Sequence, residues 1–198
     1  MKIPSATYRL QLNSKFNFGS AEHILDYLDA LGITDIYASP ILKAKSASTH
    51  GYDMTDPAEI NPEIGGEAGF AKLIGKVREK GFGWIQDIVP NHMAYDSENK
   101  YILDIFENGH LSRYFDHFDI EWEHPIENLH SKALAPFLGD FYGTCIDGAQ
   151  IQLIFKEGGF FIKFYSIIFS LRVDDYAGIL KYGLDELRNR LGDDLFFI

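Results

Sequence analysis

The chain has 198 residues, 46% of them hydrophobic, a single cysteine and a formal net charge of −11. The apolar content excludes a disordered chain, the lone Cys145 excludes an internal disulfide and indicates a reducing, cytoplasmic compartment, and no apolar run is long enough to cross a membrane. The acidic balance argues against nucleic acid as a partner, because neutralising phosphate requires clustered Lys and Arg, but it is compatible with a neutral polar substrate.

The amino-terminal residues predict a strand, a helix and a second strand. Residues 6–12 alternate as a strand. A helix with Ser20 as its expected N-cap follows, and its apolar stripe runs to Leu31 before Gly32 ends it in a left-handed conformation. Residues 33–40 form the second predicted strand. The very short junction between the helix and this strand is typical of a parallel βαβ unit.

A long loop is expected next, and it contains the sequence "STHGYDMTDP", residues 48–57. Residues 65–81 predict a second helix that Gly81 closes, and residues 82–92, "FGWIQDIVPNH", predict a third strand. The order strand, helix, strand, helix, strand predicts a parallel sheet. Because ligands bind at the carboxyl ends of such strands, "HGYD" and "DIVPNH" both fall where a site is expected.

The regular alternation ends after residue 92. Residues 98–118 predict a helix followed by irregular chain, residues 150–166 predict a hairpin with Gly158 and Gly159 at its turn, and residues 175–191 predict a helix. We therefore expect a boundary near residue 95, with a β/α domain before it and an α+β subdomain after it. The predicted domains are 1–95 and 96–198.

The motif "DIVPNH" places polar groups at the end of an apolar strand. The carboxylate of Asp87 is costly to bury unless it is paired, and a position at the mouth of a pocket would explain it. The imidazole of His92 can hydrogen-bond a hydroxyl group while it stays neutral. The alternative is a strand-ending turn, in which Pro90 and Asn91 are turn residues and Asp87 is a buried structural hydrogen-bonding group.

The motif "STHGYD" combines a ring with an acid in a predicted loop. Tyr52 can lay its ring on the CH groups of a pyranose while Asp53 accepts hydrogen bonds from hydroxyl groups, and Gly51 lets the backbone bend. The alternative is an Asx-type turn around Asp53 with Tyr52 packed over it. The histidines show no ligand spacing, no phosphate loop follows a strand, and no nucleophile elbow is present, so we predict neither metal nor cofactor.

These motifs resemble the first conserved segments of the α-amylase clan of glycoside hydrolases, and longer stretches narrow the resemblance to the amino-terminal part of the maltooligosyltrehalose synthases. The resemblance implies a (β/α)8 TIM barrel, an α/β fold of which this chain holds the first three βα strands, with a subdomain inserted after strand 3. The stretches that carry it are "PSATYRLQL", "IYASPILKAKSASTHGYDMTDPAEINPEIGG", "ENGHLSRYFDHFDIEW" and "LAPFLGDFYG".

The resemblance also implies a reaction and roles for the motif residues. The reducing-end α-1,4 linkage of a maltooligosaccharide would become an α,α-1,1 linkage by intramolecular transglucosylation. Tyr52 would stack under the glucosyl ring, His92 would hydrogen-bond the same sugar, Asp87 would orient catalytic groups, and His50 and Asp53 would line the pocket. Asn91 matches a position that supports calcium in many amylases, although this subgroup is not expected to need the metal. A trehalose-releasing hydrolase would act on the product.

The chain departs from the family pattern in one respect. In the family, the nucleophilic Asp and the acid Glu lie on later strands, so we expect this chain alone to be inactive. "LRVDDYAG" resembles the nucleophile motif, with Arg172 and Asp174 in the right order, but it follows a predicted hairpin arm. Two other interpretations stay open: a different hydrolase or transglycosylase of the clan, and a non-catalytic carbohydrate-binding remnant.

Overall fold

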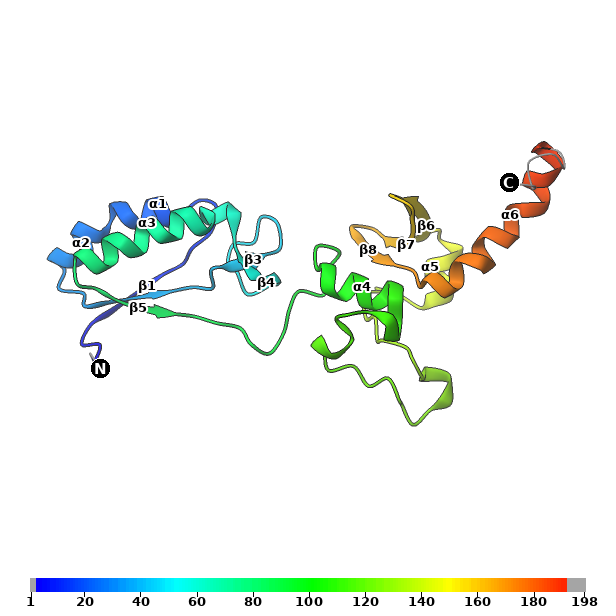
Figure 1. Ribbon diagram of the computed structural model, residues 1–198, viewed down its shortest axis with the longest axis horizontal. Coiled ribbons are helices and arrows are strands. Elements are labelled where there is room, and N and C mark those ends of the chain that lie inside the picture. Colours follow the sequence, from blue (N-terminus) through cyan, green and yellow to red (C-terminus); the bar gives the residue numbers. More distant parts are fainter. Residues whose placement is uncertain (1–2, 192–198) are drawn as a thin grey trace. The chain divides into compact units, whose positions relative to one another are not determined.

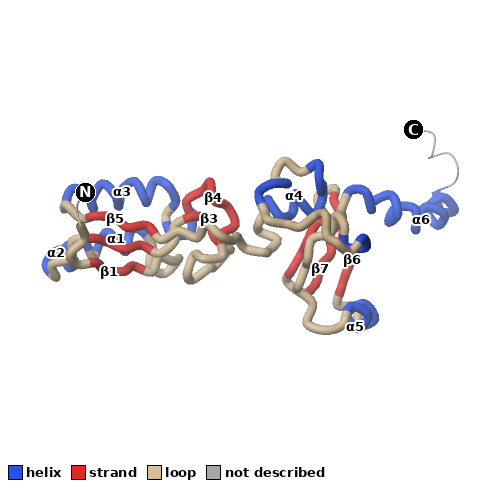
Figure 2. The backbone as a smooth tube through the Cα atoms, turned by 90° about the horizontal axis from the view of Figure 1, so that it is seen from below, coloured by secondary structure: helices blue, strands red, loops and turns tan. Residues whose placement is uncertain are grey.

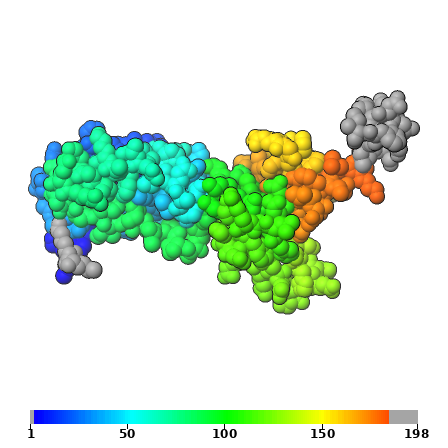
Figure 3. All heavy atoms as spheres, viewed as in Figure 1, coloured from blue at the N-terminus to red at the C-terminus, as the bar shows by residue number. Residues whose placement is uncertain are grey.

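The computed structural model describes residues 3–191, with side chains as far as residue 183, and divides into two units, Met1–Lys100 and Tyr101–Ile198. Figure 3 colours the first unit from blue to green and the second from green through yellow to orange. Each unit is described by itself. Within the described residues, no helix has both the length and the apolar content needed to cross a bilayer. The domain limits 1–95 and 96–198 stay a prediction.

The first unit is built on three parallel strands, as the sequence predicts. These are β1 (Thr7–Leu10), β2 (Asp35–Ala38) and β5 (Gly83–Gln86), in the spatial order β1-β2-β5. Their register aligns Arg9 with Tyr37, and Tyr37 with Ile85. Because side chains alternate along a strand, these three residues share one face of the sheet, and their neighbours in sequence share the other.

Three helices cover only one face of this sheet (Figure 1). They are α1 (Phe18–His23), α2 (Leu25–Ala30) and α3 (Gly66–Glu79). Their apolar stripes pack on the alternate strand positions that point toward them, and removal of these side chains from water is the main force that stabilises the unit. The buried side chains of this core include Leu10, Leu12, Phe18, Ala21, Leu25, Leu28, Ile36, Ala38, Leu73 and Val77.

The first helix begins earlier than the sequence analysis predicts. Ser20 is not the N-cap: the side-chain oxygen of Asn17 caps the helix and accepts the backbone N–H of Ser20 at 3.0 Å. Phe18, only 1% exposed, needs the earlier start to reach the core. The chain also breaks at Ile24 into two short helices, whereas Gly32 adopts the expected left-handed conformation with φ +81°.

The predicted long loop is in fact a two-stranded antiparallel ribbon, which Figure 2 shows beyond the ends of the sheet. Its strands are β3 (Leu42–Ala44) and β4 (Met54–Ile60), and the 3-10 turn Pro62–Ile64 leads from it into α3. The prediction was wrong because the pairing shifts register twice within β3 and β4 carries a proline, so no period-two pattern is visible.

The second unit combines a three-stranded antiparallel sheet with helices. The sheet has the order β6-β7-β8, and the predicted helices near residues 100 and 176 are confirmed. Its elements are α4 (Lys100–Asn108), α5 (Tyr142–Asp147), β6 (Ile151–Lys156), β7 (Gly159–Phe164), β8 (Ile167–Ser170) and α6 (Tyr176–Leu191), with 3-10 turns at Gly109–Leu111, Phe115–His117, Glu127–Leu129 and Val173–Asp175.

The core of the second unit is aromatic. The ring centroid of Phe137 lies 5.7 Å from that of Phe164 and 5.3 Å from that of Phe169. Phe106 of α4 packs edge-on against Phe169 with the centroids 5.3 Å apart. These contacts hold α4 and the irregular segment before α5 on one face of the sheet.

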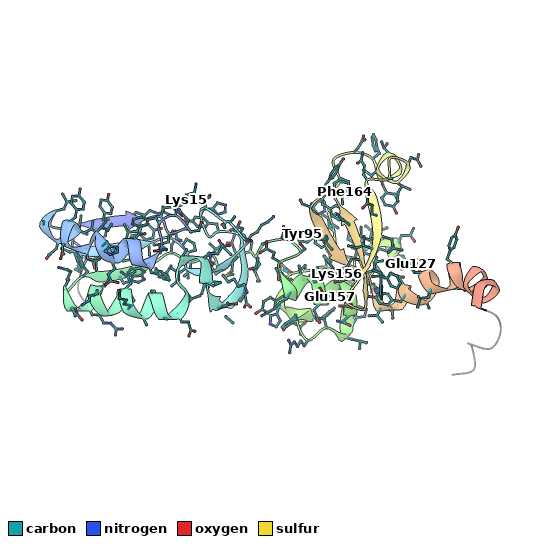
Figure 4. The ribbon with its side chains drawn as sticks, turned by 90° about the horizontal axis from the view of Figure 1, so that it is seen from above. Lys15, Tyr95, Glu127, Lys156, Glu157 and Phe164 are labelled. Atoms are coloured by element: carbon teal, nitrogen blue, oxygen red, sulfur yellow. The ribbon has the colours of Figure 1, made fainter. Side chains whose placement is uncertain are left out.

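The hairpin is confirmed, but its turn lies one residue earlier than predicted. Glu157 and Gly158 form the turn, with φ +52° and +85°, and Gly159 already pairs with Lys156 in the ladder. Two successive positive φ values are typical of a type I′ turn. Figure 4 places Lys156 and Glu157 at the end of the sheet opposite Phe164. The third strand, β8, was missed because the turn before it contains Tyr165 at φ +51° in place of a glycine.

Candidate functional site

The carboxylate of Asp87 lies at the carboxyl edge of the first sheet. Its backbone N–H donates to the Ala38 carbonyl at 3.0 Å, so it directly continues the pairing of β5 with β2. One carboxylate oxygen accepts hydrogen bonds from the hydroxyl groups of Tyr52, at 2.5 Å, and Tyr37, at 3.0 Å. The Arg9 guanidinium lies 3.7 Å from the same oxygen. The half-buried carboxylate is therefore paired, as its position in an apolar strand predicts.

The phenol of Tyr52 is held from two sides. It donates to Asp87 and accepts a hydrogen bond from the Arg9 guanidinium at 3.0 Å. The hydrogen bond to Asp87 raises the pKa of Tyr52 above its ordinary 10.0, burial acts in the same direction, and the hydrogen bond from Arg9 opposes both. With a pKa above 10.0 the phenol stays protonated at physiological pH and donates its hydrogen bond to the carboxylate.

His92 and Tyr52, which are 40 positions apart in the chain, meet at this edge. The Nε2 atom of His92 lies 3.2 Å from the carbonyl oxygen of Tyr52. A carbonyl oxygen only accepts, so Nε2 carries the proton here, and Nδ1 of a neutral His92 is an acceptor. The predicted meeting of the two strand-end motifs is confirmed as geometry, and the roles of these residues in binding stay a prediction.

The loop that carries Tyr52 is folded by its own hydrogen bonds. The Ser48 hydroxyl donates to the Asp53 carboxylate and accepts the backbone N–H of Gly51 at 3.1 Å. Gly51 has φ +76°, and a Cβ atom there would lie 2.9 Å from the carbonyl oxygen of Pro40. Ser48 closes this turn, whereas the alternative interpretation expects an Asx-type turn around Asp53, and Tyr52 reaches Asp87 instead of packing over the turn.

The remaining predicted site residues differ in how they are connected: His50 and Asp53 lie together in the loop, and Asn91 lies apart from them. His50 accepts the backbone N–H of Tyr52 at 3.0 Å through Nδ1, and this atom lies 3.8 Å from the Asp53 carboxylate. Asn91 is exposed and takes no part in the hydrogen bonds that join the other residues of the described site. Across the described side chains, no cluster of His, Cys, Asp and Glu could hold a metal ion.

Asp174 lies in the second unit and lacks the surroundings of a nucleophile. It belongs to the 3-10 turn Val173–Asp175 that follows β8 of the antiparallel sheet, not to the carboxyl end of a parallel strand. Its side chain is 76% exposed and accepts a hydrogen bond from Arg172 at 2.6 Å. Asp174 therefore forms a surface ion pair and lacks the parallel-strand context that the motif in "LRVDDYAG" requires.

Sequence reasoning missed three residues of this edge: Arg9, Gln11 and Tyr37. Arg9 and Gln11 alternate with the buried Leu10 and Leu12, so they point away from the helices. Polar side chains at alternate positions near the end of a predicted strand were the available signal. The signal was weak because it does not tell which residues of neighbouring strands lie beside them.

Comparison with known proteins matches residues 19–143 to the family described as "Alpha amylase, catalytic domain". Over 158 residues the chain is 40% identical to a protein described as putative maltooligosyl trehalose synthase from Mycobacterium tuberculosis (strain ATCC 25618 / H37Rv), a match that covers 75% of this chain and 20% of the relative. It is 41% identical over 109 residues to a cyclomaltodextrinase from Geobacillus thermopakistaniensis, covering 55% of this chain and 18% of that protein.

Comparison with solved structures finds similar proteins. A structure described as DSM5389 glycosyltrehalose synthase matches with a TM-score of 0.77 and 38% identity, over 89% of this chain and 23% of that chain. A maltooligosyltrehalose synthase from Arthrobacter ramosus matches with a TM-score of 0.73 and 32% identity, over 86% of this chain and 21% of that chain. The chain thus spans about a fifth of the length of the curated relative.

Proposed function

The chain belongs to the α-amylase family, and from this premise we propose that its first unit is the amino-terminal part of a (β/α)8 barrel. Three parallel strands with helices on one face alone support this, because the strands of such a barrel turn their other face inward. Ile85 is 37% exposed and the Arg9 side chain 40% exposed on that uncovered face. Three strands do not close a barrel, so further strands would cover these residues.

The substrate we propose is an α-1,4-linked glucan. The observation that carries this proposal is the meeting of Tyr52 and His92 at the carboxyl edge. A phenol ring held in place by its hydroxyl group keeps its faces available for the CH groups of a pyranose, and the adjacent imidazole offers a hydrogen bond to a hydroxyl group of the same sugar. His50 and Asp53 would line the pocket, and Asp87 would orient its neighbours.

The reaction we propose for the parent protein is that of a maltooligosyltrehalose synthase. The α-1,4 bond at the reducing end breaks as a Glu protonates its oxygen, and the oligosaccharide is held on an Asp; the anomeric hydroxyl of the released glucose then displaces the Asp and returns its proton to the Glu. Water must be excluded, or hydrolysis competes. The 40% identity over 158 residues supports this assignment. A trehalose-releasing hydrolase would consume the product, and both would act in the cytoplasm.

We propose that the 198-residue chain binds glucan without converting it. The carboxylates at the edge accept hydrogen bonds from hydroxyl groups of the protein, Asp87 from two tyrosines and Asp53 from Ser48, which supports a positioning role for both. The catalytic Asp and Glu would come from later strands of the parent protein. Trehalosyl products formed from maltopentaose by the purified chain would contradict this part of the proposal.

Calorimetry with maltopentaose tests the binding step. The wild-type chain should bind weakly, and Tyr52→Ala and His92→Ala should each lower the affinity about fivefold or more, because a lost stacking ring or hydrogen bond costs on the order of 1 kcal/mol or more. Tyr27→Ala is the matched control, because Tyr27 is 59% exposed on α2 and lies outside the site. Unchanged weak binding in both site variants would leave the motifs with a packing role only.

A second candidate is a hydrolase of the same family, which the match to a cyclomaltodextrinase supports. Product analysis on the protein that the full gene encodes separates the two reactions. Loss of reducing ends without release of small sugars indicates the mutase. Free glucose or maltose, with a gain in reducing ends, indicates the hydrolase.

A further inference from the structure

Two polar residues at the end of the first strand, Arg9 in β1 and Gln11 just after it, make contacts that converge on the loop of Tyr52. We propose that Arg9 and Gln11, here called the β1 clamp, are positioning residues that fix the ring of Tyr52 and so set the affinity of the site. The glucan part of this inference rests on the proposed function; the positioning part does not. Arg9 lies on the uncovered face of β1, on the same side of the sheet as Tyr37, and Gln11 follows Leu10, the last residue of the strand.

The guanidinium of Arg9 is held in a fixed orientation. One nitrogen donates to the Tyr52 hydroxyl at 3.0 Å, and the other donates to the Gln11 side-chain oxygen at 2.8 Å. Its central carbon lies 5.4 Å from the centroid of the Tyr37 ring, and one of its nitrogens lies 3.7 Å from the Asp87 carboxylate. A planar group with two directed hydrogen bonds and a ring beside it has little freedom to rotate.

Gln11 connects the same strand to the backbone of the loop. Its side-chain nitrogen lies 3.2 Å from the His50 carbonyl oxygen and 3.4 Å from the Thr49 carbonyl oxygen, and it donates to both. The clamp therefore holds the loop at two points, by the hydroxyl of Tyr52 and by the backbone just before it. A single hydrogen bond to Asp87 would leave the ring free to pivot about its hydroxyl group.

The contacts of the clamp are made to the protein, which points to action through Tyr52. Each terminal nitrogen of Arg9 donates one hydrogen bond to a protein group. The side-chain nitrogen of Gln11 is engaged in the same way. The charge of Arg9 is also balanced by Asp87. Loss of the clamp should therefore change the position of Tyr52 before it changes anything else in the site.

The position of Tyr52 can be read directly from the ionisation of its phenol. In a chain labelled with ring-13C tyrosine, the Tyr52 signal is assigned by its absence in Tyr52→Phe and followed by NMR as the pH is raised. In Arg9→Met we expect the pKa of Tyr52 to fall toward 10.0, because a ring released from the clamp leaves Asp87. If the ring stays in place without Arg9, loss of the cation raises that pKa further, and this result would overturn the proposal.

Two more variants keep the test decisive. Arg9→Lys retains the charge but not the planar fork, and should restore the Tyr52 pKa only in part. Gln11→Met removes the contact with the loop backbone and the acceptor of one Arg9 nitrogen, but it leaves the hydrogen bond from Arg9 to Tyr52. It should shift that pKa downward by less than Arg9→Met, and this variant decides the matter if Arg9→Met does not fold. Arg78→Met, at an exposed position in the last turn of α3, is the matched control and should leave the Tyr52 signal unchanged.

The glucan measurement adds the functional consequence. Arg9→Met should weaken maltopentaose binding about fivefold, which corresponds to about 1 kcal/mol of binding free energy, because the ring of Tyr52 is misplaced. If the wild-type chain binds no maltooligosaccharide, the proposed function fails, and the NMR titration still decides whether the clamp positions Tyr52. If Arg9→Met binds glucan as tightly as the wild type, the affinity part of this inference is wrong.

Discussion

The replacement of Gly51 by alanine should deform the loop of Tyr52 at its tightest point. Gly51 has φ +76°, a conformation that costs an L-residue about 1 kcal/mol. The new Cβ atom would also lie 2.9 Å from the carbonyl oxygen of the buried Pro40. Because this oxygen belongs to the backbone, it cannot rotate away from the new atom as a flexible side chain could. Such overpacking costs about 1–3 kcal/mol, so we expect Gly51→Ala to destabilise the first unit by about 2–4 kcal/mol.

Gly32→Ala separates the two contributions. Gly32 has φ +81°, close to that of Gly51, but a Cβ atom at Gly32 meets nothing within 4 Å. This variant should cost only the conformational share, about 1 kcal/mol. The difference between the two variants, about 1–3 kcal/mol, then measures the contact with Pro40 alone.

Urea denaturation followed by tryptophan fluorescence provides the assay. In a Trp122→Phe background, Trp84 is the only tryptophan left, and it packs against the core of the first unit. The midpoint for Gly51→Ala should fall by roughly 1 M more than that for Gly32→Ala, with an unchanged slope. Equal midpoints for the two variants would refute the reasoning, because they would mean that the loop yields to the new Cβ without cost.

Three further predictions concern stability. Although burial alone would raise the pKa of Asp96, its hydrogen bond from Lys45 holds that pKa below 3.8. The ion pair therefore stabilises the folded chain at pH values above the pKa of an unfolded aspartate. The stability advantage over Asp96→Asn, measured as a difference in urea midpoints, should vanish as the pH falls below about 3.8. Gly83→Ala places a Cβ 1.8 Å from the Asp35 carboxylate and should lower the free energy of unfolding by about 2–3 kcal/mol. The same change should cost less in an Asp35→Ala background, and a double-mutant cycle measures the difference. Glu157→Asn should stabilise the hairpin by about 0.5 kcal/mol in thermal melts, since asparagine tolerates φ +52°.

The parallel sheet was predictable because its signals are local. Apolar periodicity and the stops at Gly32 and Gly81 are enough to indicate two helices that each lead straight into a strand. The start of the first helix could not be predicted, because Asn17 and Ser20 are both acceptable caps and only the burial of Phe18 decides between them. Strand β8 was not predicted because the turn before it depends on Tyr165 at a positive φ, which no sequence rule favours.

The site was predictable only in part. Tyr52 and His92 were found because strand ends of a parallel sheet meet at one edge, which is a property of topology and not of exact contacts. Arg9 and Tyr37 were missed because their contacts depend on which residues stand side by side in neighbouring strands. Asn91 was included on resemblance alone, and it lies exposed outside the hydrogen-bonded cluster.

The apolar core decides the register on which the site depends. A shift of β1 by one residue would turn Arg9 and Gln11 toward the helices and bring Leu10 and Leu12, now 3% and 2% exposed, to the open face. Full burial of a leucine side chain is worth about 1.5–3 kcal/mol, whereas a hydrogen bond of the clamp contributes about 0.5–1.5 kcal/mol. The burial of Leu10 and Leu12 therefore outweighs the polar contacts, and Arg9 reaches Tyr52 because these two leucines fix the register of the strand.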